Sequence, residues 1–398
     1  MTLANGRSYL AIPGPSVIPD RVLQAMHRAS PNIYTGELVD MVPGIVADLK
    51  SISGTSHHCA IYVANGHGAW EAAVSNILNA GDRVLLLATG IFAHGWGEMA
   101  QRLGADLEVL EFGNHDPIDP AAVTRALAAD KDHRIKAVMA THVDTATSIR
   151  NDIPALRRAI NAADHPALLM VDCIASLACD RFEMDAWGVD LMVAGCQKGL
   201  MTPPGMAFVF FNDRADKLRD TCARTSWYWD WRPRVKPEDF YQYFGGTAPT
   251  HHLYGLREAL DMIAEEGLES VWARHETLAR AYWAAFQAWG QDGPISMNVK
   301  DPGIRSNAVT SLAIGAQNGT RLREWLIENT GVTLGIGLGM STPDDPDADG
   351  FFRVGHMGHV NAHMVLGVIG AIETGLCALD IPHGSGALDA AIAVCAAG

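Results

Sequence analysis

The stretch ALLMVD at residues 167–172 is apolar up to its last position, and LMVAG at residues 191–195 is apolar throughout. Strands that are apolar on both faces are typical of a parallel sheet that helices cover on both sides. Similar short runs flank these two, and amphipathic stretches separate them. The sequence therefore predicts an α/β fold with a mostly parallel sheet. The predicted strands are Ala60–Ala64, Arg83–Ala88, Leu107–Glu111, Ile135–Thr141, Ala167–Asp172, Leu191–Gly195 and Met206–Phe211, and helices between them include Ala69–Leu78, Ala121–Ala129 and Ile153–Ala163.

The pattern of the sequence changes after residue 212. Residues 213–246 are rich in loops and aromatic side chains, and a long helical stretch follows from His251 to about Trp289, with a break near Gly267. From about Gly293 the chain contains two or three strands and two or three helices, which is enough for a small α+β domain. We expect an N-terminal arm at residues 1–20, a large domain at residues 21–275 and a small C-terminal domain at residues 276–398.

The composition limits what kind of protein this chain can be. It has 398 residues, with 30 Lys plus Arg against 45 Asp plus Glu, so its formal net charge is −15. This length corresponds to about two to three domains, and 48% hydrophobic with 19% charged residues is typical of a globular protein rather than a disordered one. Because the net charge repels phosphate backbones, nucleic acid is not an expected partner. A site for a small anion must be built locally against this charge.

The cysteines and the two ends of the chain indicate a cytoplasmic protein. The cysteine count is odd and no pair has C-x-x-C spacing, which favours unpaired thiols in a reducing compartment. The N-terminus has no apolar segment after a basic start, and the C-terminus has no lipidation or targeting motif. The longest apolar stretch, Met364–Leu379, is interrupted by Glu373 and is too short for a bilayer, which needs about 20 residues. The cysteines are Cys59, Cys173, Cys179, Cys196, Cys222, Cys377 and Cys395.

A carboxylate and an amine follow the two strands that define the sheet. Asp172 is the last residue of one strand, and Lys198 lies just past the end of the other. Ligands of parallel α/β proteins bind outside the carboxyl ends of the strands. Either residue alone would more often be a turn or surface residue, but Lys198 also lies between apolar strands and a PPG turn at Pro203–Gly205. A desolvated lysine with a lowered pKa is suited to Schiff-base chemistry.

The sequence ANGHGAWEAA at residues 64–73 follows a strand and opens a helix near Ala69. Its glycines would let the backbone approach a ligand, and the first amides of the helix would point at an anion. The segment lacks the Walker A ending and the G-x-G-x-x-G spacing. Two interpretations remain open, a phosphate site and a plain turn capped by Asn65.

A third candidate element is FRVGHMG at residues 352–358. Arg353 ends an apolar strand, and its guanidinium suits a carboxylate, although a surface ion pair is the alternative. His356 and His359 have no other ligand at metal-binding spacing, so no metal site is expected. The glycine-rich segment Gly335–Gly339 leads into STPDD and not into a helix, which predicts a flexible loop near the site.

Taken in order, these motifs resemble the class V, fold-type I pyridoxal-phosphate aminotransferases, in particular the alanine/serine/aspartate–glyoxylate branch. The resemblance covers nearly the whole chain. The lysine motif with its upstream VD is specific, and the other motifs contribute mainly because they occur in the same order. The motifs are PGP near the start, GHGAWEAA, LLMVDCIASL, GCQKGLMTPPG, SWYWDW, LYGLREAL and RVGHMG.

The resemblance implies a role for each residue toward pyridoxal 5'-phosphate. Lys198 would form the Schiff base and shuttle the proton between the substrate α-carbon and the cofactor, and Asp172 would pair with the protonated pyridine nitrogen. Arg353 would bind the substrate α-carboxylate. These enzymes are homodimers with shared sites, so Thr247 would reach the phosphate in the neighbouring subunit. The other cofactor contacts would come from Asn65, Gly66, His67 and Gln197 at the phosphate, Thr145 near the phenolic oxygen, Phe92 on the pyridine face, and Ile174.

Two departures from the family pattern concern the ligands. The family often has Tyr where this chain has Phe244, which removes a hydroxyl contact to phosphate. The sequence TSIR at residues 147–150 replaces a more usual threonine-glycine pair and adds a guanidinium. Arg150, Arg232 or Arg234 could bind a second carboxylate, which would favour aspartate as the amino donor, or all three could be surface residues.

The resemblance implies transamination onto glyoxylate, with glycine as product and a ping-pong mechanism. L-serine or L-aspartate is the expected donor, ahead of L-alanine. One alternative is a transaminase for pyruvate or a pyridoxamine-like substrate, which shares the arginine and the stretch VWARH. A lyase or desulfurase on the same scaffold is another, but a desulfurase needs a nucleophilic cysteine on a mobile loop and Gly331–Gly350 contains none. A non-catalytic binding protein is the third, and the presence of both Asp172 and Lys198 argues against it.

Overall fold

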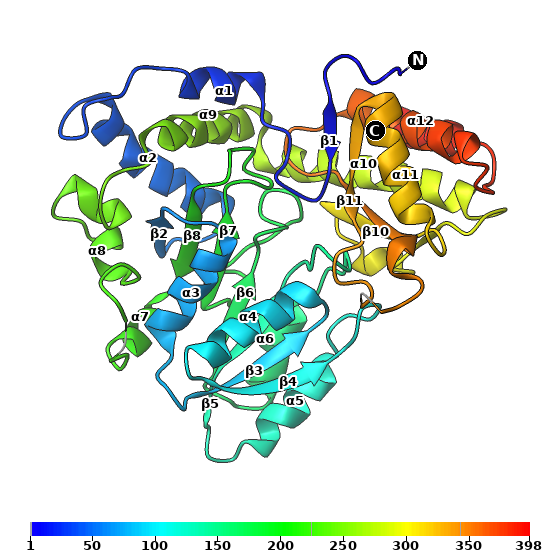
Figure 1. Ribbon diagram of the computed structural model, residues 1–398. Helices are drawn as coiled ribbons and strands as arrows, with labels where there is room; N and C mark the ends of the chain where they lie inside the picture. Colours follow the sequence, from blue (N-terminus) through cyan, green and yellow to red (C-terminus); the bar gives the residue numbers. More distant parts are fainter. Residues whose placement is uncertain (1, 224, 343) are drawn as a thin grey trace.

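The computed structural model describes residues 2–223, 225–342 and 344–398. The chain forms a large unit around a seven-stranded sheet and a small unit around a five-stranded sheet (Figure 1). Both sheets are covered by helices, and the N-terminal and C-terminal segments both lie on the small unit. This architecture confirms the predicted α/β class.

The large sheet has the strand order β2-β8-β7-β6-β5-β3-β4. Strand β8 runs antiparallel to both of its neighbours, and the remaining pairs are parallel, so the sheet is mostly parallel as predicted. Every strand expected from the sequence is present, with ends shifted by at most two residues. The strands are β2 His58–Tyr62, β3 Arg83–Ala88, β4 Asp106–Glu111, β5 Ile135–Thr141, β6 Leu168–Asp172, β7 Leu191–Gly195 and β8 Ala207–Phe211.

The two faces of the large sheet pack into separate hydrophobic clusters. Along β3, Leu85 and Leu87 belong to one cluster, whereas Val84 and Leu86 belong to the other. Successive side chains of a strand point to opposite faces, so both faces must be apolar when helices cover both. All five residues of β6 and of β7 are buried for this reason. The edge strand β4 has only one neighbouring strand and is partly exposed.

Several helices of the large unit begin at residues whose side chains cap the first turn. The side chain of Asn65 accepts hydrogen bonds at the start of α3, and Asp119 and Asp152 do so at α5 and α6. Gly267 has a φ of 83° and separates α9 from α10, as predicted. The helices are α1 Asp20–Met26, α2 Glu37–Ile52, α3 Gly66–Ile77, α4 Ile91–Arg102, α5 Pro120–Ala129, α6 Ile153–Ala162, α7 Asp213–Arg219, α8 Arg232–Val235, η1 Phe240–Phe244, α9 Thr250–Glu266 and α10 Leu268–Trp289.

The small sheet has the order β1-β11-β12-β10-β9, and its first strand comes from the N-terminal segment. Strand β1 pairs in parallel with β11, beside which it lies in Figure 1. The expectation of two or three strands after Gly293 was too low, because the described residues of this segment form four strands, one of which, β9, has only two residues. The small unit contains β1 Tyr9–Ala11, β9 Ser296–Met297, η2 Pro302–Ile304, β10 Val309–Ala313, α11 Asn318–Thr330, β11 Val332–Ile336, η3 Ala348–Gly350, β12 Phe351–Gly355, α12 Ala362–Ala378 and α13 Ala387–Ala397.

Only part of the glycine-rich segment Gly335–Gly339 forms the loop that the sequence predicts. Gly335 and Ile336 end strand β11 and pair with β12. A Cβ on Gly335 would lie 2.5 Å from Pro13, and one on Gly337 would lie 2.4 Å from Phe351. The glycines therefore allow close packing of the strand and the turn after it, a constraint that spacing alone does not reveal.

Helix α10 connects the two units. Val271 belongs to a cluster of the large unit, whereas Leu278 and the residues after it belong to the cluster of the small unit. The predicted boundary after residue 275 falls inside this helix, and the domain division stays a prediction.

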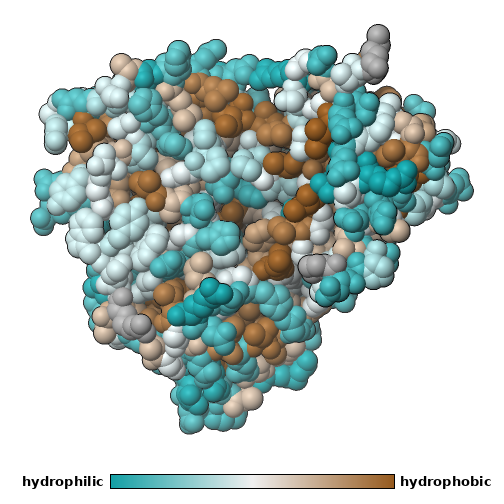
Figure 2. Space-filling model, viewed as in Figure 1, coloured by the Kyte–Doolittle hydropathy of each residue, from teal (hydrophilic) through white to brown (hydrophobic). Residues whose placement is uncertain are grey.

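On the surface, apolar side chains gather over α1 and beside β1 (Figure 2), where Leu23 and Leu10 are exposed. Most of the rest of this face is hydrophilic or neutral. Of the helices in the described part of the chain, none combines the length and the apolar composition needed to cross a membrane.

Candidate active site

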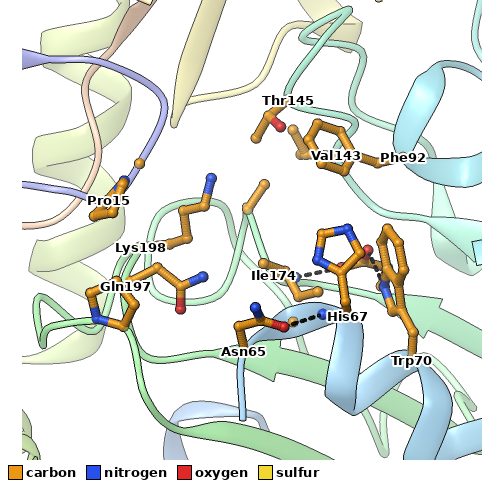
Figure 3. A pocket seen from close by; sticks show the side chains of 15 residues that line it. Pro15, Asn65, His67, Trp70, Phe92, Val143, Thr145, Ile174, Gln197 and Lys198 are labelled. Atoms are coloured by element: carbon orange, nitrogen blue, oxygen red, sulfur yellow. Dashed lines mark hydrogen bonds between the residues drawn. The ribbon is translucent and has the colours of Figure 1, made fainter. Parts of the chain in front are cut away.

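A cavity of about 260 Å³ lies beyond the carboxyl ends of β6 and β7. Every predicted site residue lines it except Thr247 and Arg353 (Figure 3). Because these residues come from loops that follow different strands, the parallel sheet brings them together as the sequence predicts. The wall consists of Gly14, Pro15, Asn65, Gly66, His67, Trp70, Phe92, Val143, Thr145, Asp172, Ile174, Ala175, Gln197, Lys198 and Pro204.

Lys198 lies in the turn that follows β7, and its amine projects into the cavity (Figure 3). Its Nζ donates a hydrogen bond to the carbonyl of Pro13. Desolvation, together with the nearby positive charge of Arg353, lowers the pKa of Lys198 to about 8. A Cβ on Gly14 would lie 2.5 Å from the lysine side chain, so the glycine of the PGP motif makes room for it. More of this amine is neutral near pH 7 than in an ordinary lysine, and the neutral form is the nucleophile.

Asp172, the last residue of β6, lines the cavity and is buried. Its Oδ2 accepts a hydrogen bond of 2.8 Å from Trp70 Nε1, and its Oδ1 accepts one of 2.7 Å from the amide of Ile174. Burial raises the pKa of Asp172 to about 7, and both donors oppose that rise. The carboxylate is therefore poised to hold a cationic group that enters the cavity.

Trp70 is a site residue that the sequence analysis missed. It lies in α3 directly after the glycine-rich turn, and its ring stacks on Trp96 at 6.3 Å between centroids. The signal was available, because a buried tryptophan usually finds an acceptor for its N–H. The identity of that acceptor depends on the packing of α3 against the sheet.

The turn at Asn65 is both a capped helix start and part of the cavity wall. Asn65 Oδ1 accepts hydrogen bonds from the amides of His67 and Gly68, at 3.1 and 3.4 Å. The predicted cap at Asn65 is thus present. A Cβ on Gly66 would lie 2.5 Å from Ile174, so this start of α3 approaches the strand ends closely. Such a helix N-terminus favours an anion in the cavity.

Gln197 faces the same part of the cavity, between Lys198 and Asn65 (Figure 3). Within the described residues its carboxamide oxygen is buried and has no hydrogen-bond partner. A buried polar atom without a partner is costly. This arrangement is expected where a polar ligand completes the hydrogen bonding.

A second missed residue, Asp144, fixes the position of Phe92. Asp144 is buried, and its Oδ2 accepts hydrogen bonds from the amides of Phe92 and Ala93, at 2.9 and 3.3 Å. Its Oδ1 accepts one of 2.9 Å from Ala146. Burial raises the pKa of Asp144, and the charge of Arg353 opposes that rise. The sequence gives the same indication for Asp144 as for Asp172, because both are acidic residues at or just after the carboxyl end of a strand, β5 and β6 respectively.

Arg353 does not line the cavity but contacts its wall. It lies on β12 of the small unit, and its Nη1 donates a 2.8 Å hydrogen bond to the carbonyl of Thr145. Its Nε donates to the carbonyl of Ile336 at 2.7 Å. Burial lowers the pKa of Arg353 to about 10, and the charge of Asp144 opposes this. The guanidinium therefore lies beside the cavity wall, near enough to Lys198 for its charge to lower the pKa of that lysine.

Thr247 and Phe244 lie apart from the cavity of their own chain. Thr247 is exposed in the segment between η1 and α9. Phe244 is buried in the core and packs against Phe240, with 5.5 Å between ring centroids. The side chain at position 244 thus contributes to packing in this chain.

The three arginines considered for a second carboxylate are all engaged outside the cavity. Arg234 is buried and donates to the carbonyls of Ile61 and Tyr228 at 2.8 and 2.6 Å. Arg232 contacts carboxylates of α7 and the residue after it, and Arg150 donates to the carbonyl of Gly303 at 3.0 Å. None of the three lines the cavity. Within one chain, the hypothesis that they bind a second carboxylate there is not supported, because the fold uses their guanidinium groups elsewhere.

The histidines considered as metal ligands are placed differently. His356 is buried, with Nδ1 2.8 Å from the carbonyl of Asn307 and Nε2 3.0 Å from the hydroxyl of Thr310. His359 is exposed. In residues 2–223, 225–342 and 344–398, no group of three or more His, Cys, Asp or Glu side chains is arranged to hold a metal ion. The seven cysteines are unpaired thiols, five of them buried.

Comparison with known sequences places this arrangement in a family context. The family model described as "Aminotransferase class-V" matches residues 8–344. The chain is similar to the serine–glyoxylate aminotransferase of Methylorubrum extorquens, with 38% identity over 393 residues that cover 96% of this chain and 94% of the relative. It is also similar to the L-aspartate–glyoxylate aminotransferase of Paracoccus denitrificans, with 34% identity over 93% of this chain and 91% of the relative.

Solved structures with the same fold include two aminotransferases. The pyridoxamine–pyruvate aminotransferase of Mesorhizobium loti superposes with a TM-score of 0.88 and 25% identity over the full length of both chains. The ureidoglycine–glyoxylate aminotransferase of Bacillus subtilis superposes with a TM-score of 0.85 and 25% identity, covering 98% of this chain and 99% of the other.

Proposed function

Because the chain belongs to the class V aminotransferases and is therefore an enzyme of the transferase class, we propose that it transfers the amino group of a small L-amino acid to glyoxylate, giving glycine. The observation that carries the proposal is the cavity between Lys198 and Asp172, with Arg353 held behind its wall. The serine–glyoxylate and L-aspartate–glyoxylate activities named for the relatives support glyoxylate as the acceptor and L-serine or L-aspartate as the donor.

The residues of the cavity fit pyridoxal 5'-phosphate. The start of α3 at Gly66 and His67 and the carboxamide of Gln197 would hold the phosphate, Phe92 would lie on the pyridine face, and Asp172 would hold the pyridine nitrogen. The first amides of α3 support this fit because they are donors at a helix N-terminus, whereas the unpartnered Gln197 oxygen is an acceptor and would need bound water or a protonated group as its partner. When bound, this cofactor would serve as an electron sink and would carry the amino group between the two halves of a ping-pong reaction.

Three side chains would then act on the cofactor and the substrate, and a fourth would hold an aromatic ring of the cavity in place. Lys198 Nζ, with its pKa lowered to about 8, would hold the cofactor through a Schiff base and move the proton at the substrate α-carbon. The Asp172 carboxylate would keep a proton on the ring nitrogen by charge pairing. The Arg353 guanidinium would orient the substrate by its α-carboxylate. Asp144 would keep Phe92 in place through two backbone amides.

A homodimer with shared sites is part of the proposal. Thr247 is exposed, so it is available to the cavity of a second copy. The large side chains of Tyr34 and Trp227 are 82% and 70% exposed and are available to a second copy. The cytoplasmic location stays a prediction.

The proposed function is tested by the products. Protein loaded with pyridoxal 5'-phosphate is mixed with glyoxylate and with L-serine, L-aspartate or L-alanine in separate reactions, and glycine and the matching 2-oxo acid are quantified. We expect equimolar products, with the highest initial rate for L-serine or L-aspartate. If no donor yields glycine, the proposal is wrong.

A second candidate is a transaminase that uses pyruvate as acceptor and a pyridoxamine-like donor. The observation that favours it is the fold shared with a pyridoxamine–pyruvate aminotransferase over the full length of both chains. The same assay with pyruvate and pyridoxamine separates the two, because glyoxylate-dependent glycine formation is expected only from the first.

The variant Arg353→Lys is expected to raise the KM for both the amino acid and glyoxylate by about 10- to 100-fold, since hydrogen bonds to charged groups contribute about 1.5–3 kcal/mol. Lysine keeps the charge but loses the two-pronged geometry that suits a carboxylate. The KM values come from initial rates, and the affinity for pyridoxal 5'-phosphate comes from its absorbance. Arg321→Lys, an exposed change on α11, is the control. An unchanged KM in Arg353→Lys would exclude this residue as the carboxylate ligand.

A further inference from the structure

The loop at residues 145–150 belongs to the large unit and makes hydrogen bonds to the small unit. We call it the bridging loop. The carbonyl of Thr145 accepts from Arg353, and the carbonyl of Thr147 accepts a 2.9 Å hydrogen bond from the side chain of Asn298. The carbonyl of Ser148 accepts from the amide of Ser306 at 3.2 Å. The bridging loop therefore couples the cavity wall to the part of the small unit that carries Arg353.

Ser148 has a backbone conformation that favours glycine. Its φ is 62°, in the left-handed region, and the residue is buried. For a residue with a Cβ this conformation costs about 1–2 kcal/mol, a strain that glycine does not have. The backbone geometry alone would thus favour glycine at this position.

The hydroxyl of Ser148 makes a contact between the two units that glycine cannot make. Its Oγ donates to the carbonyl of Thr147 and accepts a 3.2 Å hydrogen bond from the amide of Ser311. Ser311 lies on β10, directly opposite Arg353 of β12 in the antiparallel register. The hydroxyl is therefore bonded to the backbone of the residue that pairs with Arg353 in the small sheet.

We propose that Ser148 is a positioning residue whose hydroxyl holds β10 and β12 against the cavity wall and so fixes the Arg353 guanidinium before substrate binds. The proposal rests on the proposed function in one respect, the binding of the substrate carboxylate by Arg353. A pre-positioned guanidinium does not have to be ordered when the substrate arrives, which lowers the cost of binding. The Arg353 side chain also donates a hydrogen bond to the carbonyl of Ile336 on β11. Ser148 contacts β10, so it acts on the position of Arg353 through that strand.

The variants Ser148→Gly and Ser148→Ala test this role. Both remove the hydroxyl, but glycine also relieves the left-handed strain, so Ser148→Gly is expected to fold normally. In both, the KM for the amino acid and for glyoxylate is expected to rise about 3- to 10-fold, as for the loss of one hydrogen bond, with kcat within about twofold. The amide of Ser311 is expected to exchange with deuterium faster in both variants, with or without cofactor, because it loses its acceptor.

Asp164→Gly is the matched control. Asp164 has a φ of 49° and is exposed just after the end of α6, so this change relieves the same kind of strain without touching the bridging loop. It is expected to leave KM and the Ser311 exchange unchanged. An unchanged exchange rate in Ser148→Gly overturns the proposed contact, and faster exchange with an unchanged KM overturns the positioning role. Failure of the proposed function is distinct, because the wild-type protein would then give no glycine while the exchange measurement still reports on the contact.

Discussion

Replacing Lys198 with alanine is expected to lower kcat for transamination by at least about 10³-fold, the range that a positioned acid–base group contributes. The variant lacks both the amine that would hold pyridoxal 5'-phosphate covalently and the base at the α-carbon. Lys198 is the one lysine that lines the described cavity, and its pKa is lowered to about 8. The measurement is the rate of glycine formation, with the visible absorbance of the bound cofactor as a second readout.

Two controls separate chemistry from folding in this experiment. Lys198→Arg keeps a positive charge but cannot form the Schiff base, so it is expected to be as inactive as Lys198→Ala. Lys136→Ala removes an exposed lysine of β5 and is expected to behave as wild type. Added methylamine is expected to restore part of the activity of Lys198→Ala, because a small amine can replace the missing base. Retention of more than about a tenth of the wild-type kcat in Lys198→Ala contradicts the role of this lysine.

Replacing Asp172 with asparagine is expected to lower kcat by about 10²- to 10³-fold, since removing one partner of a buried charge pair costs about 2–5 kcal/mol. Asparagine has almost the same shape, but its single carboxamide oxygen can replace only one of the two oxygens that accept from Trp70 and Ile174, so the free energy of unfolding is measured alongside kcat. It cannot balance a charged pyridine nitrogen. A kcat within tenfold of wild type would show that the cavity does not use this carboxylate as a counter-ion.

The pH dependence of Trp70→Phe provides a graded test of the same carboxylate. The pKa of Asp172 is about 7, and the Trp70 N–H favours the ionised form. Removing that donor raises the pKa, so more of the carboxyl is protonated near pH 7 and the acidic limb of the kcat profile moves to higher pH. Trp96→Phe is the control, because Trp96 stacks on Trp70 and its own N–H has no partner among the described residues. Identical profiles for the two variants would contradict this account.

Local sequence rules found the residues that lie at the ends of strands. Asp172, Lys198 and the Asn65 turn each follow an apolar run that can only be a buried strand, and the parallel sheet aligns those ends on one side. Asp144 obeys the same rule and could have been found by it. Trp70 could be recognised as buried, but its acceptor is 102 positions away and is determined by how α3 packs on the sheet.

The arginines show where sequence reasoning fails. Arg150, Arg232 and Arg234 have the right chemistry for a carboxylate, and their partners in the fold are distant backbone carbonyls and carboxylates. In the sequence, Arg353 differs from them by the apolar strand that it ends and by the glycine-spaced turn that follows. The contact of Arg353 with the wall of the cavity depends on how the small unit packs against the bridging loop.

The sequence by itself determined the mostly parallel sheet, the strand ends and the residues that follow them, because apolar periodicity and turn residues act locally along the chain. The tertiary structure alone decided the raised pKa of Asp172, since its desolvation depends on every segment packed around it, whereas the lowered pKa of Lys198 was expected from its position between apolar strands. It also decided that the N-terminal segment completes the small sheet and that Ser148 bonds to the strand beside Arg353. These contacts join residues far apart in the chain, and only the packing of the two units brings them within hydrogen-bonding distance.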